Sequence, residues 1–214
     1  MKPGIEDVKA WYDDFVDSIK WYHDPDRQNG RFVRIKSVLG SIIKPGTDVL
    51  DLGCGTGITT HHIGLLGARV TGVDIADGMI EFAKGHSSNQ NTSYMVEDVV
   101  DMRLEKTFDT VVMCDVLEHI RRDRIPDLMH TIDLHCGDTT NIYLNVPDGR
   151  YSRYALTNPQ IIDEAWDMIE VLGLFKSIGF EPVSVGMYGL DVKMPQYNDY
   201  VFVKESVLVR GYGI

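Results

Sequence analysis

Three glycines alternate with other residues directly after a short apolar run, in the segment Val49-Leu50-Asp51-Leu52-Gly53-Cys54-Gly55-Thr56-Gly57. Glycine permits positive φ and lets a ligand approach the backbone, and the start of a following helix offers free N–H groups to an anion. The dinucleotide spacing G-x-G-x-x-G fails in both registers, because its sixth position is Ile58 or Thr60. Asp51 would be a poor neighbour for a pyrophosphate and a good one for a cationic α-amino group. The loop therefore favours an amino-acid-like ligand over NAD.

Two more carboxylates follow the next predicted strands. Asp74 follows the predicted strand 69–73, where a carboxylate can accept both hydrogen bonds of a ribose diol. Asp98 follows the predicted strand 92–96, where it can accept from an adenine amino group. Met79 comes soon after Asp74, and a flat ring can pack on its thioether. An amine, a ribose and an adenine together describe S-adenosyl-L-methionine.

The motifs from Val49 to His119 resemble those of the class I S-adenosylmethionine-dependent methyltransferases. They are D-x-G-x-G-x-G at 51–57, G-V-D at 72–74, E-D-V at 97–99 and F-D-x-V-x-x-x-D-V-L-E-H at 108–119, and the last resembles small-molecule enzymes of the ubiquinone-biosynthesis type. The resemblance implies S-adenosyl-L-methionine as cofactor and S-adenosyl-L-homocysteine as product. The cofactor-binding residues that we expect are Tyr12, Arg31, Asp51, Gly53, Cys54, Gly55, Gly57, Asp74, Ile75, Met79, Asp98, Val99 and Asp115.

The elements that must position these residues alternate between short apolar strands and helices, which is typical of an α/β, Rossmann-like, doubly wound sheet. The resemblance implies seven strands with the last one antiparallel. Residues 1–43 are expected to form an N-terminal helical lid and residues 44–214 the methyltransferase domain. The pattern predicts helices at 5–22, 30–43, 116–134 and 163–178, strands at 181–186 and 200–209, and irregular segments at 147–160 and 187–199.

Asp115 and His119 are the candidate catalytic residues. They lie four positions apart in the predicted helix 116–134 and its approach, a spacing that places two side chains on one helix face. Methyl transfer to a hydroxyl needs alignment and removal of a proton, and His119 is the expected base because imidazole titrates near neutral pH. Asp115 could orient His119, act as base itself or contact the methionine moiety. No cluster has metal-ligand spacing, so we expect no metal.

The acceptor is expected to be a small molecule bound by the two irregular segments. Arg150, Tyr151, Arg153 and Tyr154 could bind a phosphorylated or nucleotide-linked group, or could form a solvated loop. Aromatic and amide side chains in 187–199 suit a sugar, and the C-terminal pattern resembles methyltransferases of deoxysugars or glycans. O-methylation of a sugar or glycan terminus is the preferred hypothesis, N-methylation of an amine such as an aminosugar is the alternative, and a non-catalytic S-adenosylmethionine-binding protein is a remote third.

The composition of the chain limits its binding partners, its cysteine chemistry and its expected localisation. The 214 residues carry 32 acidic and 21 basic side chains, a net charge of −11, which weighs against nucleic acid as a partner. Cys54, Cys114 and Cys136 form no CxxC pair and are expected to be reduced thiols. No apolar run approaches the ~20 residues of a membrane span, and the N-terminus lacks the apolar core of a signal peptide. We therefore expect a cytoplasmic protein without a membrane span, and leave its oligomeric state open.

Overall fold

The computed structural model describes residues 3–20, 30–150, 160–189 and 196–212. The chain divides into two compact units, Met1–Val99 and Val100–Ile214, which are described separately. The predicted boundary between a lid and a methyltransferase domain at residue 43 stays a prediction.

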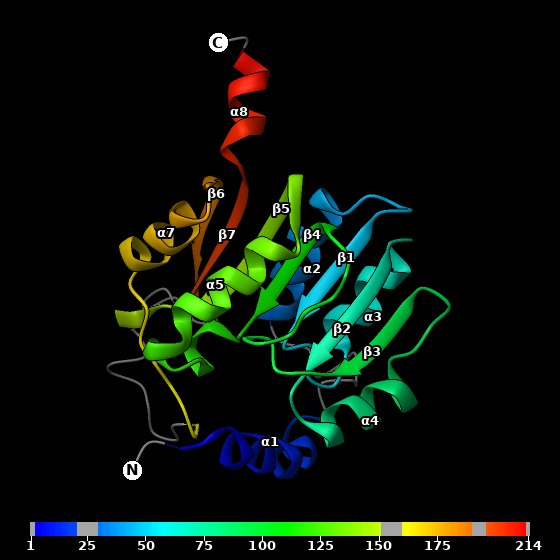
Figure 1. The fold of residues 1–214 in the computed structure, drawn as a ribbon. Helices are drawn as coiled ribbons and strands as arrows, with labels where there is room; N and C mark the ends of the chain where they lie inside the picture. The colour runs from blue at the N-terminus through cyan, green and yellow to red at the C-terminus, as the bar shows by residue number, and fades with distance from the viewer. Residues whose placement is uncertain (1–2, 21–29, 151–159, 190–195, 213–214) are drawn as a thin grey trace. The chain divides into compact units, whose positions relative to one another are not determined.

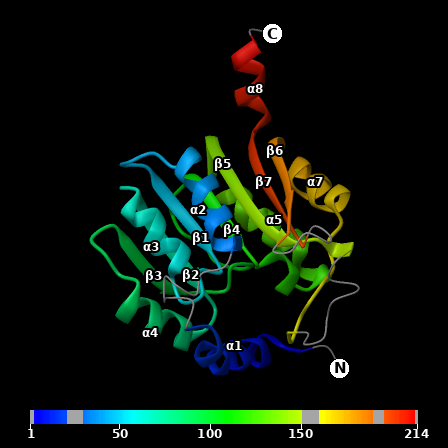
Figure 2. The same ribbon diagram turned by 180° about the vertical axis from the view of Figure 1, so that it is seen from behind.

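In the described residues of unit 1, the chain forms three parallel strands and four helices (Figures 1 and 2). The apolar side chains of these strands are largely buried, as expected for a parallel sheet covered by helices. Helices α3 and α4 pack on β2 and β3, and α2 packs beside α3. In chain order the elements are α1 (Ile5–Ile19), α2 (Gly30–Ile42), β1 (Asp48–Leu52), α3 (Ile58–Leu65), β2 (Arg69–Asp74), α4 (Asp77–His86) and β3 (Thr92–Val96).

Helix α1 is held on α4 by polar contacts at the start of α4. The Gly78 N–H donates to Asp13 Oδ1 over 2.7 Å, and Lys9 Nζ lies 2.6 Å from Asp77 Oδ2. Trp11 and Phe15 stack on one another with ring centroids 4.7 Å apart, but no residue of α1 is fully buried. The helix is therefore attached without being part of the core, and its role as a lid stays a prediction.

The described part of unit 2 forms four strands, with α5 and α7 on the same face of them (Figure 1). Strand β4 pairs in parallel with β5, whereas β7 is antiparallel to both β5 and β6. Phe175 of α7 stacks on Phe202 of β7, with ring centroids 4.4 Å apart. The elements are β4 (Phe108–Cys114), the 3₁₀ helices η3 (Leu117–His119) and η4 (Arg122–Arg124), α5 (Ile125–Leu134), β5 (Cys136–Pro147), α7 (Met168–Ser177), β6 (Phe180–Tyr188), β7 (Tyr197–Lys204) and α8 (Glu205–Tyr212).

The seven strands follow the order β3-β2-β1-β4-β5-β7-β6. The predicted doubly wound, seven-stranded sheet with an antiparallel last strand is confirmed.

The predicted helix 116–134 is wrong in its first half. Residues 117–119 and 122–124 form two separate 3₁₀ turns, and the α-helix begins at Ile125. Pro126 explains this boundary, since proline fits the first turn of a helix but not its interior. Asp115 precedes these turns with φ +55°, so Asp115 and His119 do not share a helix face.

Three other predicted boundaries are corrected. Helix α7 begins at Met168 instead of residue 163, because Asp167 and Glu170 form a capping box there. Strand β7 ends at Lys204, which pairs with the first residue of β6, and the chain then continues as α8 in place of the predicted strand 205–209. The segment 187–199 is partly regular, since β6 extends to Tyr188 and β7 begins at Tyr197. Residues 21–22 of the predicted first helix lie outside the described residues.

Two observations bear on chemistry and environment. The three cysteines, all within the described residues, are free thiols, with Cys54 buried. Within the described part of the chain, no helix is long and apolar enough to cross a membrane.

The loop from β1 to α3 depends on glycine for two different reasons. Gly53, Gly55 and Gly57 have φ values of +64°, +51° and +81°, a region that costs other residues about 1–2 kcal/mol. A methyl group on Gly57 would also lie 2.8 Å from the Tyr94 hydroxyl oxygen and 2.9 Å from Ser87 Cβ, whereas one on Gly55 would have no atom within 4 Å. Neighbouring side chains therefore fill the space beside Gly57, whereas the space beside Gly55 is open.

We predict that Gly57→Ala destabilises the protein more than Gly55→Ala does. Both variants adopt an unfavourable φ, but only Gly57→Ala adds overpacking, worth about 1–3 kcal/mol more. Urea unfolding of both variants and the parent measures the difference. Equal losses of unfolding free energy would show that the close packing around Gly57 does not exist in solution.

Candidate active site

The glycine loop is tied to the end of β2 by Asp74. Its Oδ2 accepts from the Gly55 N–H over 2.9 Å, and its Oδ1 accepts from the Ala76 N–H over 3.0 Å. Burial raises the pKa of this carboxyl, while the N–H donors oppose the shift. Each carboxylate oxygen has a second lone pair, so Asp74 can hold the loop and still accept from a ribose diol.

Asp51 lies inside the unit behind the loop. It is the next-to-last residue of β1, only 1% of it is exposed, and its Oδ2 accepts from the Thr60 hydroxyl over 2.6 Å. Burial raises the pKa of Asp51 to about 7, and the nearby Asp74 adds to the shift. A cationic group beside Asp51 would lower this pKa again. Direct contact of Asp51 with an amine stays a prediction.

The structure brings several other predicted cofactor residues to the same strand ends. The Cys54 N–H donates to the Val73 carbonyl over 2.9 Å, which joins the loop to β2. Met79 and Val99 are buried, and Ile75 and Asp98 are partly exposed. Tyr12 contacts Trp11 edge-on at 4.9 Å, and the Arg31 guanidinium lies over the Phe32 ring. Contacts of all these residues with a cofactor stay predictions.

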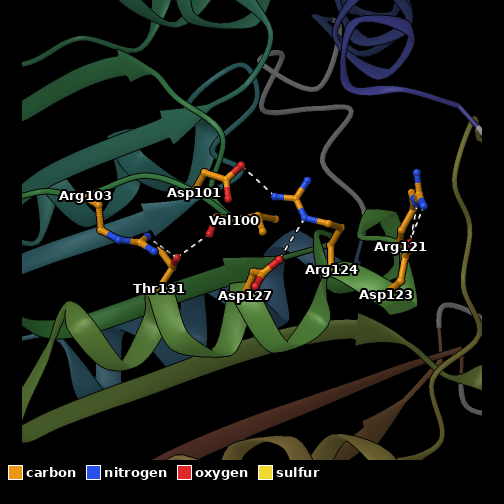
Figure 3. A network of polar contacts seen from close by, with 8 residues as sticks. All are labelled: Val100, Asp101, Arg103, Arg121, Asp123, Arg124, Asp127 and Thr131. Atoms are coloured by element: carbon orange, nitrogen blue, oxygen red, sulfur yellow. Dashed lines mark hydrogen bonds and ion pairs between the residues drawn. The ribbon is translucent and has the colours of Figure 1, made fainter.

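The chain after Asp98 and Val99 is fixed to α5 within unit 2 by the network in Figure 3. The Thr131 hydroxyl donates to the Val100 carbonyl, and Arg103 Nη1 donates to the Thr131 hydroxyl over 2.7 Å. Arg124 bridges Asp101 and Asp127, at 2.8 and 3.2 Å (Figure 3). The segment that follows the predicted adenine contact is therefore rigidly attached to a helix.

His119 of η3 is arranged as a neutral imidazole with one nitrogen committed to the protein. Its Nδ1 lies 2.8 Å from the Ile162 carbonyl oxygen. A carbonyl only accepts, so Nδ1 carries the proton and Nε2 is the basic atom. Burial lowers the pKa of His119 below its ordinary 6.5, so at neutral pH the 3.7 Å approach of Glu118 Oε1 to Nε2 is not an ion pair.

The segment 160–167 holds η3 in place. The Trp166 indole N–H donates to the Leu117 carbonyl over 3.2 Å, and the Glu164 N–H donates to the Glu118 carbonyl over 2.8 Å. Arg122 lies 4.1 Å above the Trp166 ring and pairs with Glu170. These contacts fix the orientation of His119 from a part of the chain more than 40 residues away.

Asp115 and Asn145 meet at the carboxyl ends of β4 and β5. The Asp115 N–H donates to the Asn145 carbonyl over 3.0 Å, and η3 packs against β5. The positive φ of Asp115 is unusual for a residue other than glycine, and such strain concentrates at functional sites. Asn145 was missed by sequence reasoning, although an amide within the apolar run 142–146 was an available signal.

Of the arginines predicted in 147–160, Arg150 is described and Arg153 lies outside the described residues. Arg150 donates from Nε and Nη2 to the carboxylate of the buried Asp148, over 2.9 and 2.8 Å. This pairing holds the pKa of Asp148 below its usual value. Tyr151 and Tyr154 also lie outside the described residues. Among the residues that the structure describes, no group of three or more His, Cys, Asp or Glu side chains is arranged to hold a metal ion.

The strand order, the loop of three glycines and the carboxylate at the end of β2 together define a class I methyltransferase fold. Residues 49–151 match the model of a methyltransferase domain family. The matched residues are just under half of the chain, and they indicate a methyltransferase domain whose cofactor is S-adenosylmethionine.

Comparison with individual proteins agrees with this assignment. A ubiquinone biosynthesis O-methyltransferase from Xanthomonas campestris pv. campestris is 37% identical over 92 residues, which are 41% of this chain and 38% of that protein. The chain thus spans about two fifths of that relative. DhpI in complex with SAH superimposes with a TM-score of 0.74 at 18% identity, covering 94% of this chain and 96% of DhpI. The 1,6-didemethyltoxoflavin-N1-methyltransferase of Burkholderia thailandensis superimposes with a TM-score of 0.71 at 18% identity. The match covers 94% of this chain and 91% of that enzyme.

The residues present fit this cofactor. The space open at Gly55 permits close approach of a ligand to the loop backbone. Asp74 retains acceptor capacity for a ribose at the end of β2. The buried, partly protonated Asp51 provides a charge that a cationic amine would stabilise.

We predict that Asp51→Asn stabilises the ligand-free protein increasingly as pH rises from 5 to 8. The Asp51 carboxyl has a pKa of about 7 in the folded protein and its ordinary pKa of 3.8 in the unfolded chain, so unfolding releases a proton between these pH values. Stability is therefore lost as pH rises through this window, by about 1–4 kcal/mol in total, and asparagine avoids the loss. Thermal unfolding of both proteins across this pH range measures it.

Asp48→Asn is the matched control on the same strand. Asp48 is paired with Arg69 near the surface, at 3.0 and 2.8 Å, so its replacement should cost little and show no gain toward pH 8. A stability difference between Asp51→Asn and the parent that is constant from pH 5 to 8 would contradict the raised pKa.

Proposed function

We propose that the protein transfers a methyl group from S-adenosylmethionine to a hydroxyl of a small molecule, with His119 as the general base. The arrangement of His119 carries this proposal. Nδ1 is held by the Ile162 carbonyl and burial keeps the ring neutral, so Nε2 is oriented and ready to accept a proton at pH 7. The name of the Xanthomonas relative supports an oxygen acceptor.

The cofactor supplies an electrophilic methyl group on a sulfonium, so the protein's task is to align the acceptor and manage its proton. His119 Nε2 would accept the hydroxyl proton as the oxygen attacks. Asp115 would assist as a positioning residue, because its backbone is locked to β5 through the Asn145 carbonyl. The fixed contacts of segment 160–167 keep the imidazole from turning away.

A sugar or glycan terminus is our preferred acceptor class. Tyr188 and Tyr197 stack with ring centroids 5.7 Å apart at the ends of β6 and β7, and Asn145 and Asn198 lie near them on β5 and β7. Aromatic faces with amide groups suit a polyol. A planar polyhydroxylated ring satisfies the same chemistry and must be tested beside sugars.

An amine acceptor is the second candidate, favoured by the N1-methyltransferase among the similar structures. A neutral amine needs little base catalysis, so the His119 requirement separates the two candidates. A non-catalytic S-adenosylmethionine-binding protein is the third hypothesis, and turnover of any acceptor excludes it.

The cofactor assignment predicts that S-adenosylmethionine and S-adenosylhomocysteine raise the melting temperature, whereas NADH does not. A ligand present at 100 times its Kd adds about 2.7 kcal/mol to the unfolding free energy. Differential scanning fluorimetry with the three ligands measures this. Stabilisation by NADH alone would contradict the interpretation of the glycine loop.

We predict that His119→Ala and His119→Gln lower kcat/KM for a hydroxyl acceptor by at least about 100-fold. In the parent, activity should fall on the acid side only below pH 6.5, because burial lowers the pKa of His119, and this decline should vanish in both variants. Rates of S-adenosylhomocysteine formation from pH 5 to 9 test both statements, and the Kd of the cofactor serves as the folding control. A loss below tenfold, or an acid limb that persists in the variants, would remove His119 from the base role.

A further inference from the structure

Asn145 holds a buried hydrogen-bond acceptor without a partner. The residue is 0% exposed, and its Nδ2 donates to the Tyr188 hydroxyl over 2.7 Å and to the Asn198 carbonyl over 3.4 Å. Its Oδ1 has no hydrogen-bond partner in the part of the chain that the structure describes. Leaving a buried acceptor unsatisfied costs about 1–3 kcal/mol, and native proteins rarely do so. A partner beyond the described residues would satisfy this oxygen, and a bound ligand is such a partner.

The position of Asn145 indicates which partner. Within unit 2 it pairs with Cys114 in the sheet register, one residue before Asp115, whose N–H donates to the Asn145 carbonyl. The η3 turn that carries His119 packs against β5, the strand of Asn145. The unpaired oxygen therefore belongs to the same carboxyl edge as the two candidate catalytic residues.

The orientation of the amide restricts the chemistry of the ligand. Because the NH₂ group is committed to Tyr188, only an acceptor oxygen remains, and its complement must be a donor. A hydroxyl or N–H satisfies it, whereas a carboxylate or phosphate would place oxygen against oxygen. The buried Asp199 is the register partner of Asn145 on β7, which disfavours an anion further.

We propose that Asn145 is a specificity-determining residue that accepts a hydrogen bond from a second hydroxyl of the methyl acceptor, beside the hydroxyl that His119 deprotonates. The acceptor class is then a diol or polyol. This inference rests on the proposed function, since it assumes that a hydroxyl is methylated at this edge. The Tyr188 hydroxyl acts as a positioning group that holds the amide.

The test compares acceptors that differ by one hydroxyl. We use catechol against phenol, and a methyl hexopyranoside against its monodeoxy analogues, with the parent and Asn145→Ala. A site built to bind a hydroxyl discriminates strongly against an analogue that lacks it, so the parent should prefer the complete acceptor by at least about 100-fold in kcat/KM. In Asn145→Ala the preference should fall to about threefold or less, mainly through KM, with an unchanged Kd for S-adenosylmethionine.

Two further variants guard against a trivial loss of folding. Asn141→Ala lies on the same strand and face, away from the carboxyl edge, and should retain the full preference. Tyr188→Phe keeps Asn145 but frees its amide, and should lower the preference by about tenfold. A parent that methylates hydroxyls while Asn145→Ala and Tyr188→Phe retain its discrimination would overturn the inference and leave the proposed function standing.

A parent that methylates no hydroxyl would overturn the proposed function and this inference with it. A crystal structure tests the Asn145 contact directly. Crystals grown with S-adenosylhomocysteine and catechol should show a catechol hydroxyl within hydrogen-bond distance of Asn145 Oδ1. A hydrogen bond to Asn145 Oδ1 from a protein group, or from any partner other than the catechol, would overturn the inference.

Discussion

The hydrogen bond from the Gly55 N–H to Asp74 is the contact on which the candidate cofactor site depends. It joins the loop after β1 to the end of β2, and so holds three residues at positive φ in one arrangement. Gly57 is packed from behind and Gly55 is open, so one side of the loop is supported by the core and the other is accessible. A backbone held in this way can approach a ligand without reorganising.

Two carboxylates at the ends of β1 and β2 lie close together beside this loop. Asp51 is buried against Thr60, and Asp74 is close enough to raise its pKa further. In a ligand-free protein this arrangement is unfavourable, since the charged form of a buried carboxyl loses its hydration. A bound cation would offset the loss, which gives a physical reason for the carboxylate to be retained at a position where asparagine would be more stable. Stability and binding oppose each other at this residue.

The sheet and the glycine loop were predictable because each strand carries a local pattern: an apolar run followed by glycine or aspartate at its end. The errors lie where long-range contacts decide. Pro126 could have located the start of α5, but the two 3₁₀ turns before it are held by Trp166 and Glu164, which no local pattern reveals. The end of β7 depends on where β6 begins. Asp115 and His119 therefore stay predicted catalytic residues, but the helix that was expected to place them on one face does not exist.

His119 and Asn145, at the carboxyl edge of unit 2, have the same hydrogen-bonding pattern. Each donates to a protein acceptor, the Ile162 carbonyl or the Tyr188 hydroxyl, and each also carries an acceptor atom, Nε2 or Oδ1. Because both of these atoms accept, the edge complements a ligand that brings hydroxyl hydrogens and disfavours one that brings anionic oxygens. One acceptor can remove a proton and the other cannot, since an amide oxygen is far less basic than imidazole. The pair would therefore distinguish the hydroxyl that is methylated from the hydroxyl that only orients the substrate.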